Sequence, residues 1–487
     1  MTTITIADKF VKIDGKRYPK SSLIPEVSGG KLTIVSGNPI LGMPVHVVPF
    51  GQVVNGATGQ AFASEQALID FIEADGNFFN GGGDGTGSQL PINSKVVILG
   101  DSLTEGTSVT SGNAAVFKSR GFFTFAHLLS GSKLYLPMGG NLGVGGQKTS
   151  EMVVRLKPLL DLNPKLVIIE AGTNDVGNSV PYLTIIRNLR LMYDTCIAAN
   201  AKVIAVTIFP RFGSPALTAP NEVIRKQVND WIKSQASSDI LVVDAEPFAN
   251  NSSYYWDGLH LSSIGASVIG SLVASAINNI VKKTGSVSSL LTTDNSYNPN
   301  LYFNGTGGAK LNGATGTVAD SYWLRANDIG ATVVGSIYTD SIGNRSQEIT
   351  VSGSYSGNYK TIDVVLTTNS NMPSSGDLIE AIAEFEIVTN DPNIIGFTMN
   401  GQLLTADYQT TLLSISSLLA EDQLSNQLAV GRRYVTRTPP NTVQAGTVGN
   451  QSNQFQMILK NTATSTPINA KIRLHKMGLR KVPANLL

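Results

Sequence analysis

The chain has 487 residues, more than one hydrophobic core usually serves, so several domains are expected. Apolar residues make up 42% of the sequence and charged residues only 15%, which excludes a disordered chain and predicts a folded protein with a weakly charged surface. The 36 basic and 35 acidic residues leave a net charge of +1, so neither nucleic acid nor an anionic membrane is an expected partner.

Cysteine usage and the first residues set further expectations. The only cysteine, Cys196, excludes an intrachain disulfide and a cysteine-based zinc site, and its apolar surroundings favour a buried thiol. The first nine residues lack the charged and apolar segments of a secretory signal. No run approaches the roughly 18 apolar residues that a membrane span needs. We therefore expect a protein made in a cytoplasm, without a membrane segment and without an N-terminal export signal.

Residues 1–80 predict a small β-rich domain with one helix. Short β-like runs occupy 31–35 and 45–48, and the segment Ser64–Ile72 opens with a serine cap and spaces its apolar residues three and four apart. A glycine-rich stretch then predicts a flexible linker over residues 81–93, because such a sequence cannot hold regular structure.

Residues 94–284 alternate β-branched runs with amphipathic helical patterns. Continuous apolar runs suit strands that are buried on both faces, which indicates a parallel sheet. The predicted strands are Val96–Leu99, Leu166–Ile169, Val203–Val206 and Ile240–Val243, and the helical patterns cover 181–199, 221–236 and 262–282. This alternation predicts a layered α/β domain.

Residues 285–487 are rich in Ser, Thr, Asn and Gly and contain alternating stretches such as Lys360–Leu366. Helical periodicity is nearly absent, apart from a weak patch near 411–424. This pattern predicts an antiparallel β-sandwich.

Candidate catalytic residues lie at the two ends of the α/β domain. Ser102 directly follows the first predicted strand, and reactive groups of an open α/β sheet lie beyond the carboxyl ends of its strands. A serine hydroxyl needs a base, and the base needs an acceptor to orient it. Asp257 precedes His260 by three residues and can serve that purpose if the turn folds back. The other three histidines, His46, His127 and His475, are interpreted as core or surface residues.

Two further segments offer hydrogen-bond donors. Gly172-Thr173-Asn174-Asp175 ends a predicted strand, and the glycine-rich segment 141–147 precedes a helical one. A glycine N–H and an asparagine amide can both point at one developing negative oxygen. Ordinary turns are the alternative interpretation of both segments.

These four segments together resemble the ordered blocks of the SGNH, or GDSL, hydrolase superfamily of esterases and lipases. The blocks match Gly100–Ser102, Asn141–Gly146, Gly172–Asp175 and Asp257–His260 in order and spacing, and the resemblance covers about 190 of the 487 residues. It implies a flavodoxin-like three-layer α/β/α sandwich and a carboxylic ester hydrolase that needs no metal or organic cofactor.

The same resemblance implies a role for each matched residue. Ser102 is the implied nucleophile, His260 the general base and Asp257 its orienting carboxylate. The implied oxyanion hole consists of the Ser102 N–H, the Gly146 N–H and the Asn174 side chain.

Several observations favour a carbohydrate ester, specifically a carbohydrate O-deacetylase. No long apolar segment suggests a lipid-binding lid, and Tyr255 and Trp256 directly precede Asp257, where aromatic faces can bind sugars; core packing is their alternative interpretation. The segment from Asn300 to Leu324 is similar to the opening strands of jelly-roll carbohydrate-binding modules.

Residues 1–80 with their glycine linker look like the particle-attachment modules of bacteriophage tail proteins. The resemblance implies a virion tailspike esterase, attached to tail or baseplate proteins and homotrimeric, that deacetylates a bacterial surface polysaccharide such as O-antigen or capsule. Two alternatives stay open: a secreted bacterial glycan esterase of the acetyl-xylan type, and an inactive receptor-binding virion protein.

Overall fold

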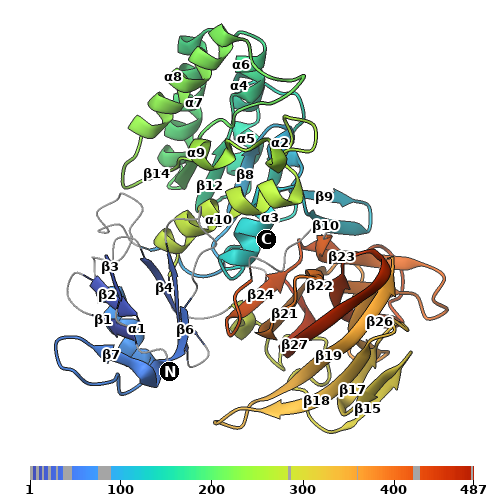
Figure 1. The fold of residues 1–487 in the computed structure, drawn as a ribbon. Coiled ribbons are helices and arrows are strands. Elements are labelled where there is room, and N and C mark those ends of the chain that lie inside the picture. Colours follow the sequence, from blue (N-terminus) through green and yellow to red (C-terminus); the bar gives the residue numbers. More distant parts are fainter. Residues whose placement is uncertain are drawn as a thin grey trace.

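The computed structural model describes residues 4–6, 10–13, 16–19, 23–28, 31–36, 46–74, 89–282, 287–358, 360–419, 428–483 and 486. Along the chain it holds a small N-terminal β part, an α/β domain in the middle, and a strand-rich C-terminal region (Figure 1). Helix α3 (Phe122–Leu129) lies on the side of the middle domain that faces the C-terminal strands, with which it shares a core.

The described residues of the N-terminal part form two small sheets and one helix. The sheets have the strand orders β3-β2-β1-β7 and β4-β5-β6. Their strands are β1 (Ile4–Ile6), β2 (Phe10–Ile13), β3 (Lys16–Pro19), β4 (Leu23–Ser28), β5 (Lys31–Ser36), β6 (His46–Pro49) and β7 (Val53–Asn55), with a 3-10 turn at Phe50–Gln52. Helix α1 (Glu65–Ala74) begins after Ser64, whose hydroxyl accepts a hydrogen bond from the Ala67 N–H, which confirms the predicted cap. A small core of its own, including Ile4, Val11 and Leu68, holds this part together.

The end of the predicted linker is held in place. Leu90 donates its N–H to the Ile280 carbonyl and accepts the N–H of Lys282, and the N–H of Asn93 donates to the Lys133 carbonyl. Residues 89–93 therefore belong to the folded part of the chain, while the glycine run 81–88 lies outside the described residues.

The middle domain is built on a five-stranded parallel sheet with the order β11-β8-β12-β13-β14. Its strands are β8 (Val96–Gly100), β11 (Asn141–Gly143), β12 (Leu166–Glu170), β13 (Lys202–Val206) and β14 (Ile240–Val243). In chain order this is the 2-1-3-4-5 arrangement of flavodoxin-like folds, which confirms the predicted topology. The start of the glycine-rich segment 141–147 therefore forms the edge strand β11 and not a turn.

Alternate residues of the strands point to the two faces of the sheet, and helices cover both. Val96 and Ile98 pack toward α3 and α10, whereas Val97 and Leu99 pack toward α7 and α8. The helices are α2 (Ser102–Glu105), α3 (Phe122–Leu129), α4 (Thr149–Val153), α5 (Leu156–Asp161), α6 (Thr173–Gly177), α7 (Tyr182–Ala198), α8 (Ala219–Ser234), α9 (Glu246–Ala249) and α10 (Ser263–Ile280), with a 3-10 turn at Ser252–Tyr254.

Helix α10 departs from one expectation. With 18 residues and a mean hydropathy of 1.4 it is, among the residues that the structure describes, the one helix long and apolar enough to cross a membrane. Eleven of its residues, including Ile269 and Val273, are buried, and they pack in the same core as α3. The apolar character of α10 is therefore explained by its packing against α3 and the central sheet.

Two stacked sheets form the C-terminal region, which is the predicted β-sandwich. One has the order β15-β17-β20-β26-β22-β23-β10-β9 and the other β16-β18-β19-β27-β21-β24, with β25 paired to β21. Rings of Phe385, Phe397 and Phe455 meet between them, with centroids 4.9 to 6.0 Å apart. The strands are β15 (Gly307–Leu311), β16 (Ala314–Gly316), β17 (Val318–Arg325), β18 (Thr332–Thr339), β19 (Arg345–Gly357), β20 (Thr361–Thr368), β21 (Leu378–Thr389), β22 (Ile394–Leu404), β23 (Thr411–Leu419), β24 (Arg433–Arg437), β25 (Asn441–Thr442), β26 (Asn450–Leu459) and β27 (Thr462–Lys481), after a 3-10 turn at Val287–Leu290. The weak helical pattern near 411–424 gives a wrong prediction for residues 411–419, which form strand β23.

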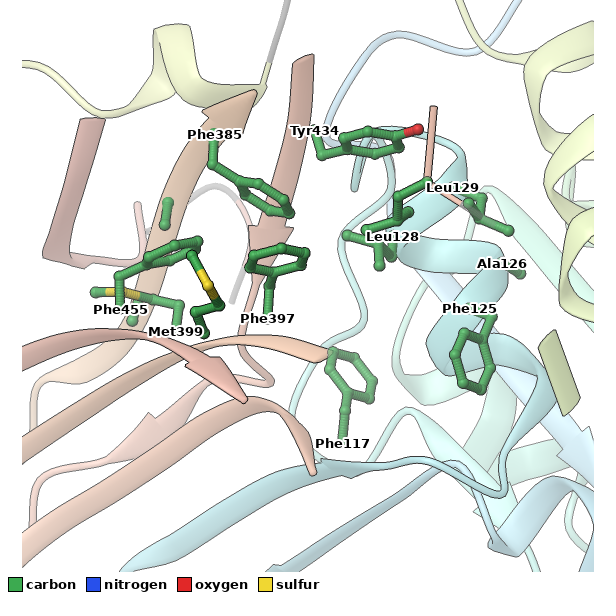
Figure 2. Close-up of a cluster of buried hydrophobic side chains, with 14 of the residues drawn as sticks. Phe117, Phe125, Ala126, Leu128, Leu129, Phe385, Phe397, Met399, Tyr434 and Phe455 are labelled. Carbon is green, nitrogen blue, oxygen red and sulfur yellow. The ribbon is translucent and has the colours of Figure 1, made fainter. Parts of the chain in front are cut away.

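The middle domain contributes a hairpin to the C-terminal sandwich. Strands β9 (Ser108–Ser111) and β10 (Ala114–Lys118) extend the eight-stranded sheet, because β10 pairs in parallel with β23. Below this hairpin one continuous core joins the two regions, and Figure 2 shows Phe117 and α3 of the middle domain facing Phe397 and Tyr434. The fold therefore couples the hydrolase sheet to the sandwich through shared packing.

A buried ion pair lies at the same junction. Arg437 and Glu380 are 2% and 0% exposed, and their side chains meet at 2.6 Å. Arg437 also donates to the side chain of Asn93 and to the carbonyl of Leu134, both in the middle domain. The pair thus stabilises the contact between the two regions as well as the sandwich itself.

Candidate active site

Ser102 begins helix α2 directly beyond the carboxyl end of β8. Asp101 caps this helix through a hydrogen bond from the Leu103 N–H to its Oδ1, at 3.0 Å. Gly100 is required before it, since a Cβ there would lie 2.1 Å from Thr104 Oγ1 and 2.5 Å from the Glu170 carbonyl oxygen. The close approach of α2 to the sheet turns Ser102 toward the rim.

His260 reaches Ser102 from the far end of the domain. Its Nε2 lies 2.9 Å from Ser102 Oγ, and its Nδ1 lies 2.7 Å from Asp257 Oδ2. Asp257 Oδ1 accepts the N–H groups of Leu259 and His260, which folds the turn back through Gly258 at a φ of +87°. The structure thus brings together the three residues that the sequence assigned to one site.

The environment of Asp257 favours its ionised form. Partial burial raises the pKa of this carboxyl, but the hydrogen bonds from the His260 ring and from the two backbone N–H groups outweigh burial and hold the pKa below its ordinary value. An ionised Asp257 accepts the Nδ1–H of His260 and leaves Nε2 to act as the acceptor for the Ser102 hydroxyl.

The two other predicted donors lie at the same edge of the sheet, Gly146 in the loop after β11 and Asn174 in α6. A Cβ built on Gly145 would lie 3.7 Å from Ser102 Cβ, which brings the segment after β11 next to the serine. The Gly145 N–H already donates to Glu105 Oε2 at 3.0 Å, whereas Gly146 has a φ of +77° and open space where a side chain would be. Asn174 donates its side-chain amide to the Gln147 carbonyl at 3.0 Å, which ties α6 to this loop.

Sequence reasoning missed the residues that hold these donors. Glu105 fixes the glycine loop, as described above, and Asp175 accepts both the N–H and the hydroxyl of Thr149, at 2.8 and 2.7 Å. Asp175 lies in the matched block beside Asn174, so the sequence shows where it stands. The sequence spacing does not predict that it contacts Thr149 on α4. Arg155 adds a support from the next turn by donating to the carbonyls of Leu142 and Gly100.

Two buried carboxyl groups lie behind the serine. Asp101 and Glu170 are both 0% exposed, and burial raises the pKa of each, with the charge of Asp101 adding to the rise at Glu170. The Arg211 guanidinium opposes both shifts. Within the described part of the chain neither carboxyl oxygen of Glu170 has a hydrogen-bond partner, which disfavours the charged form in the same direction as burial. In the sequence, Glu170 stands out only as a single acidic residue at the end of an apolar strand.

Ser102 and His260 open into a cleft of about 450 Å³. Trp256 lines the cleft, is 57% exposed, and stacks on His260 with ring centroids 5.9 Å apart. Tyr255 does not reach the cleft: it is 7% exposed, its ring packs on Phe212, and its hydroxyl donates to the Ala249 carbonyl. The prediction that Tyr255 binds sugar is therefore wrong for this structure, and core packing explains that residue.

Other residues that sequence analysis singled out lie away from the cleft. His127 on α3 is 4% exposed, and burial, with a smaller effect of Arg437, lowers its pKa to about 3. His475 is buried on β27, Cys196 is buried on α7, and the side chain of His46 is outside the described residues. Within the described part of the chain, no three His, Cys, Asp or Glu side chains gather in a way that could hold a metal ion.

Comparisons with known proteins found a matching family model and similar solved structures. Residues 98–268 match the model of the GDSL-like Lipase/Acylhydrolase family. Similar solved structures include a lipase/acylhydrolase from Enterococcus faecalis (21% identity, 40% of this chain and 100% of that chain, TM-score 0.32), a carbohydrate esterase family 3 protein from Talaromyces cellulolyticus (20%, 39% and 100%, 0.31) and a GDSL-like lipase from Bacteroides thetaiotaomicron (21%, 38% and 87%, 0.29). The search of curated proteins gave no match.

The middle of this chain is a carboxylic ester hydrolase domain of the α/β type. More narrowly, residues 98–268 form a GDSL-like, or SGNH, lipase/acylhydrolase domain.

Proposed function

We propose that the domain hydrolyses O-acetyl esters on a bacterial surface polysaccharide through an acyl-enzyme on Ser102. The observation that carries the proposal is the hydrogen-bonded chain from Ser102 through His260 to Asp257, with distances of 2.9 and 2.7 Å, at the edge of an open cleft. This is the arrangement of nucleophile, base and orienting carboxylate that acyl transfer requires.

In the proposed reaction, Ser102 Oγ attacks the ester carbonyl while His260 Nε2 takes the hydroxyl proton. The oxyanion is held by the N–H groups of Ser102 and Gly146 and by the Asn174 amide, each worth on the order of 10²–10³ in rate. His260 then gives its proton to the departing sugar oxygen, and Asp257 stabilises the imidazolium between these steps. A water molecule, deprotonated by His260, releases acetate and restores Ser102.

A sugar substrate is supported by the surroundings of the cleft. An exposed indole beside the reacting pair offers a flat apolar face, which is the kind of surface on which sugar rings stack, and Trp256 supplies it. The β-sandwich shares a core with the hydrolase domain, and strand β10, which pairs with β23 of the sandwich, ends at the cleft. A long polymer can therefore contact both regions.

We further propose that the protein works as a homotrimeric tail spike of a bacteriophage, attached to tail or baseplate proteins by residues 1–80. The separate small core of the N-terminal part supports an attachment module that folds as a unit. Mass spectrometry of purified particles tests the location, and light scattering of the purified chain tests the trimer. A chain absent from particles would contradict the tail-spike role and favour a secreted glycan esterase.

The activity is tested by acetate release from purified bacterial surface polysaccharide and from acetylated xylan, with Ser102→Ala as the control protein. We expect release from the surface polysaccharide by the native protein and none by Ser102→Ala. Faster release from xylan would favour the acetyl-xylan type of esterase. No release from any ester, including p-nitrophenyl acetate, would favour an inactive receptor-binding protein.

A further inference from the structure

One wall of the cleft carries two positive side chains. Lys118 and Arg120 line the same cleft as Ser102 and His260. The Arg120 guanidinium lies over the Trp256 ring, 5.2 Å from its centroid. Arginine and indole therefore form adjoining parts of one wall, next to the ring of the proposed base.

The backbone that carries these cations is fixed by both regions of the molecule. Strand β10 pairs with β9 on one side and with β23 on the other, where Lys118 stands opposite Leu419. The Lys118 N–H donates to the Thr107 carbonyl at 2.8 Å, and its carbonyl accepts the Thr124 hydroxyl at 2.7 Å. Ser119 between the two cations is buried, at 3% exposure, while Lys118 and Arg120 are exposed. The backbone of this wall is thus held by contacts that do not depend on a ligand.

The charge of the cleft is positive on this side. Among the residues that the structure describes, the nine that line the cleft include Lys118 and Arg120 and no carboxylate. The neighbouring acids of the site are occupied by other groups, because Glu105 accepts the Gly145 N–H and Asp257 accepts the His260 ring. Cations in a partly enclosed cleft attract anions, and a guanidinium fork fits the two oxygens of a carboxylate or phosphate.

We propose that the substrate carries a negative charge close to the acetyl ester, and that Arg120 and Lys118 bind it. The substrate class is therefore an O-acetylated anionic glycan, with the charge on a sugar carboxylate or on a phosphate. This inference rests on the proposed esterase function and adds to it the selection of charged over neutral sugars. Trp256 contacts the sugar ring while the two cations select its charged substituent.

The test compares matched substrates. Acetylated methyl galacturonoside and acetylated methyl galactoside differ in a carboxylate, and acetylated galactose 6-phosphate supplies the other anion. We expect the native protein to prefer at least one of the anionic sugars, in kcat/KM, by about tenfold or more. The preference should fall as the salt concentration rises from about 0.05 to about 0.5 M, because salt screens partly exposed charges. The anion that gives the larger ratio identifies the source of the charge.

Variants assign the preference to the wall. In Arg120→Gln combined with Lys118→Gln the ratio of anionic to neutral kcat/KM should fall to about one. Arg187→Gln, which removes an exposed arginine on α7, should keep the native ratio. Equal rates of the native protein on all three sugars, or a double variant with the native ratio, would overturn the charge selection and leave the esterase intact. Turnover of p-nitrophenyl acetate with no hydrolysis of any sugar would instead overturn the glycan function.

Discussion

Two parts of this molecule hold a serine, a histidine and a carboxylate in a row, and they differ in almost everything else. In the α/β domain Ser102, His260 and Asp257 meet at the rim of the sheet. In the sandwich Ser346 Oγ lies 2.7 Å from His475 Nδ1, and His475 Nε2 lies 3.4 Å from Glu386 Oε2. We call these the rim set and the buried set.

Exposure separates the two. The side chains of His260 and Asp257 are 33% and 31% exposed, whereas those of His475 and Glu386 are 8% and 5% exposed. Burial lowers the pKa of His475, although the contact with Glu386 opposes this shift. The buried set takes one residue from each of the neighbouring strands β19, β27 and β21, and Lys31 of the N-terminal part also contacts Glu386. A serine, a histidine and a carboxylate in contact therefore do not alone define a catalytic centre, because a substrate must also reach the serine and find donors for its oxyanion.

The largest difference between the sets should appear when each serine is removed. Ser102→Ala should lower esterase kcat by about 10⁴–10⁶, because the nucleophile is lost, while the fold stays intact. Ser346→Ala should leave kcat unchanged and lower the free energy of unfolding by about 1–3 kcal/mol, because the buried His475 Nδ1 loses its hydrogen-bond partner. Rates with p-nitrophenyl acetate and urea unfolding check both. Full activity in a folded Ser102→Ala protein would sink the assignment of the rim set.

A smaller effect concerns the donors that only the rim set possesses. Asn174→Ala should lower kcat by about 10²–10³ with little change in KM, because an oxyanion donor acts in the transition state. Asn178→Ala removes an amide from the other end of α6, where it donates to the Asn174 carbonyl, and serves as the matched control for damage to that helix. If both variants lost activity equally, the loss would come from the helix and not from the Asn174 amide.

The α/β domain was largely predictable because its signals are local. Each buried strand is a short apolar run, and Ser102 and Asn174 each follow one of them, so their positions at one sheet edge follow from parallel topology. His260 could be chosen because Asp257 stands three residues before it. Edge strand β11 was missed since Asn141–Gly143 is too short and glycine-rich to show a strand pattern.

What could not be predicted depends on contacts between distant residues. The parallel pairing of β10 with β23 joins residues about 300 positions apart, and no local pattern encodes such a pairing. Tyr255 and Trp256 are neighbours of similar chemistry. Tyr255 is the buried one because its ring packs on Phe212 and its hydroxyl donates to the Ala249 carbonyl, and both partners lie elsewhere in the sequence. The strand at 411–419 likewise takes its conformation from β22 and β10 on either side.

The smallest effect concerns the acid stability that the buried set provides. Burial raises the pKa of Glu386, but the contacts with His475 and Lys31 outweigh it and lower the pKa to about 2. A carboxylate with a depressed pKa stabilises the fold above its unfolded pKa, roughly 4.5, and this contribution is lost as the pH falls toward about 2. Glu386→Gln should therefore lower the free energy of unfolding by about 1–3 kcal/mol at neutral pH and lose less stability than the native protein on acidification.

Calorimetry across this pH window gives the measurement, and Asp161→Asn gives the control. Asp161 forms an exposed pair with Lys157 on α5, with side chains 60% and 82% exposed, so its replacement should change stability by less than about 0.5 kcal/mol at any pH. Parallel pH curves for the native protein and Glu386→Gln would mean that Glu386 gains nothing from its partners. The buried set would then stabilise the fold by packing alone, and interactions between its charges would add nothing to the free energy of unfolding.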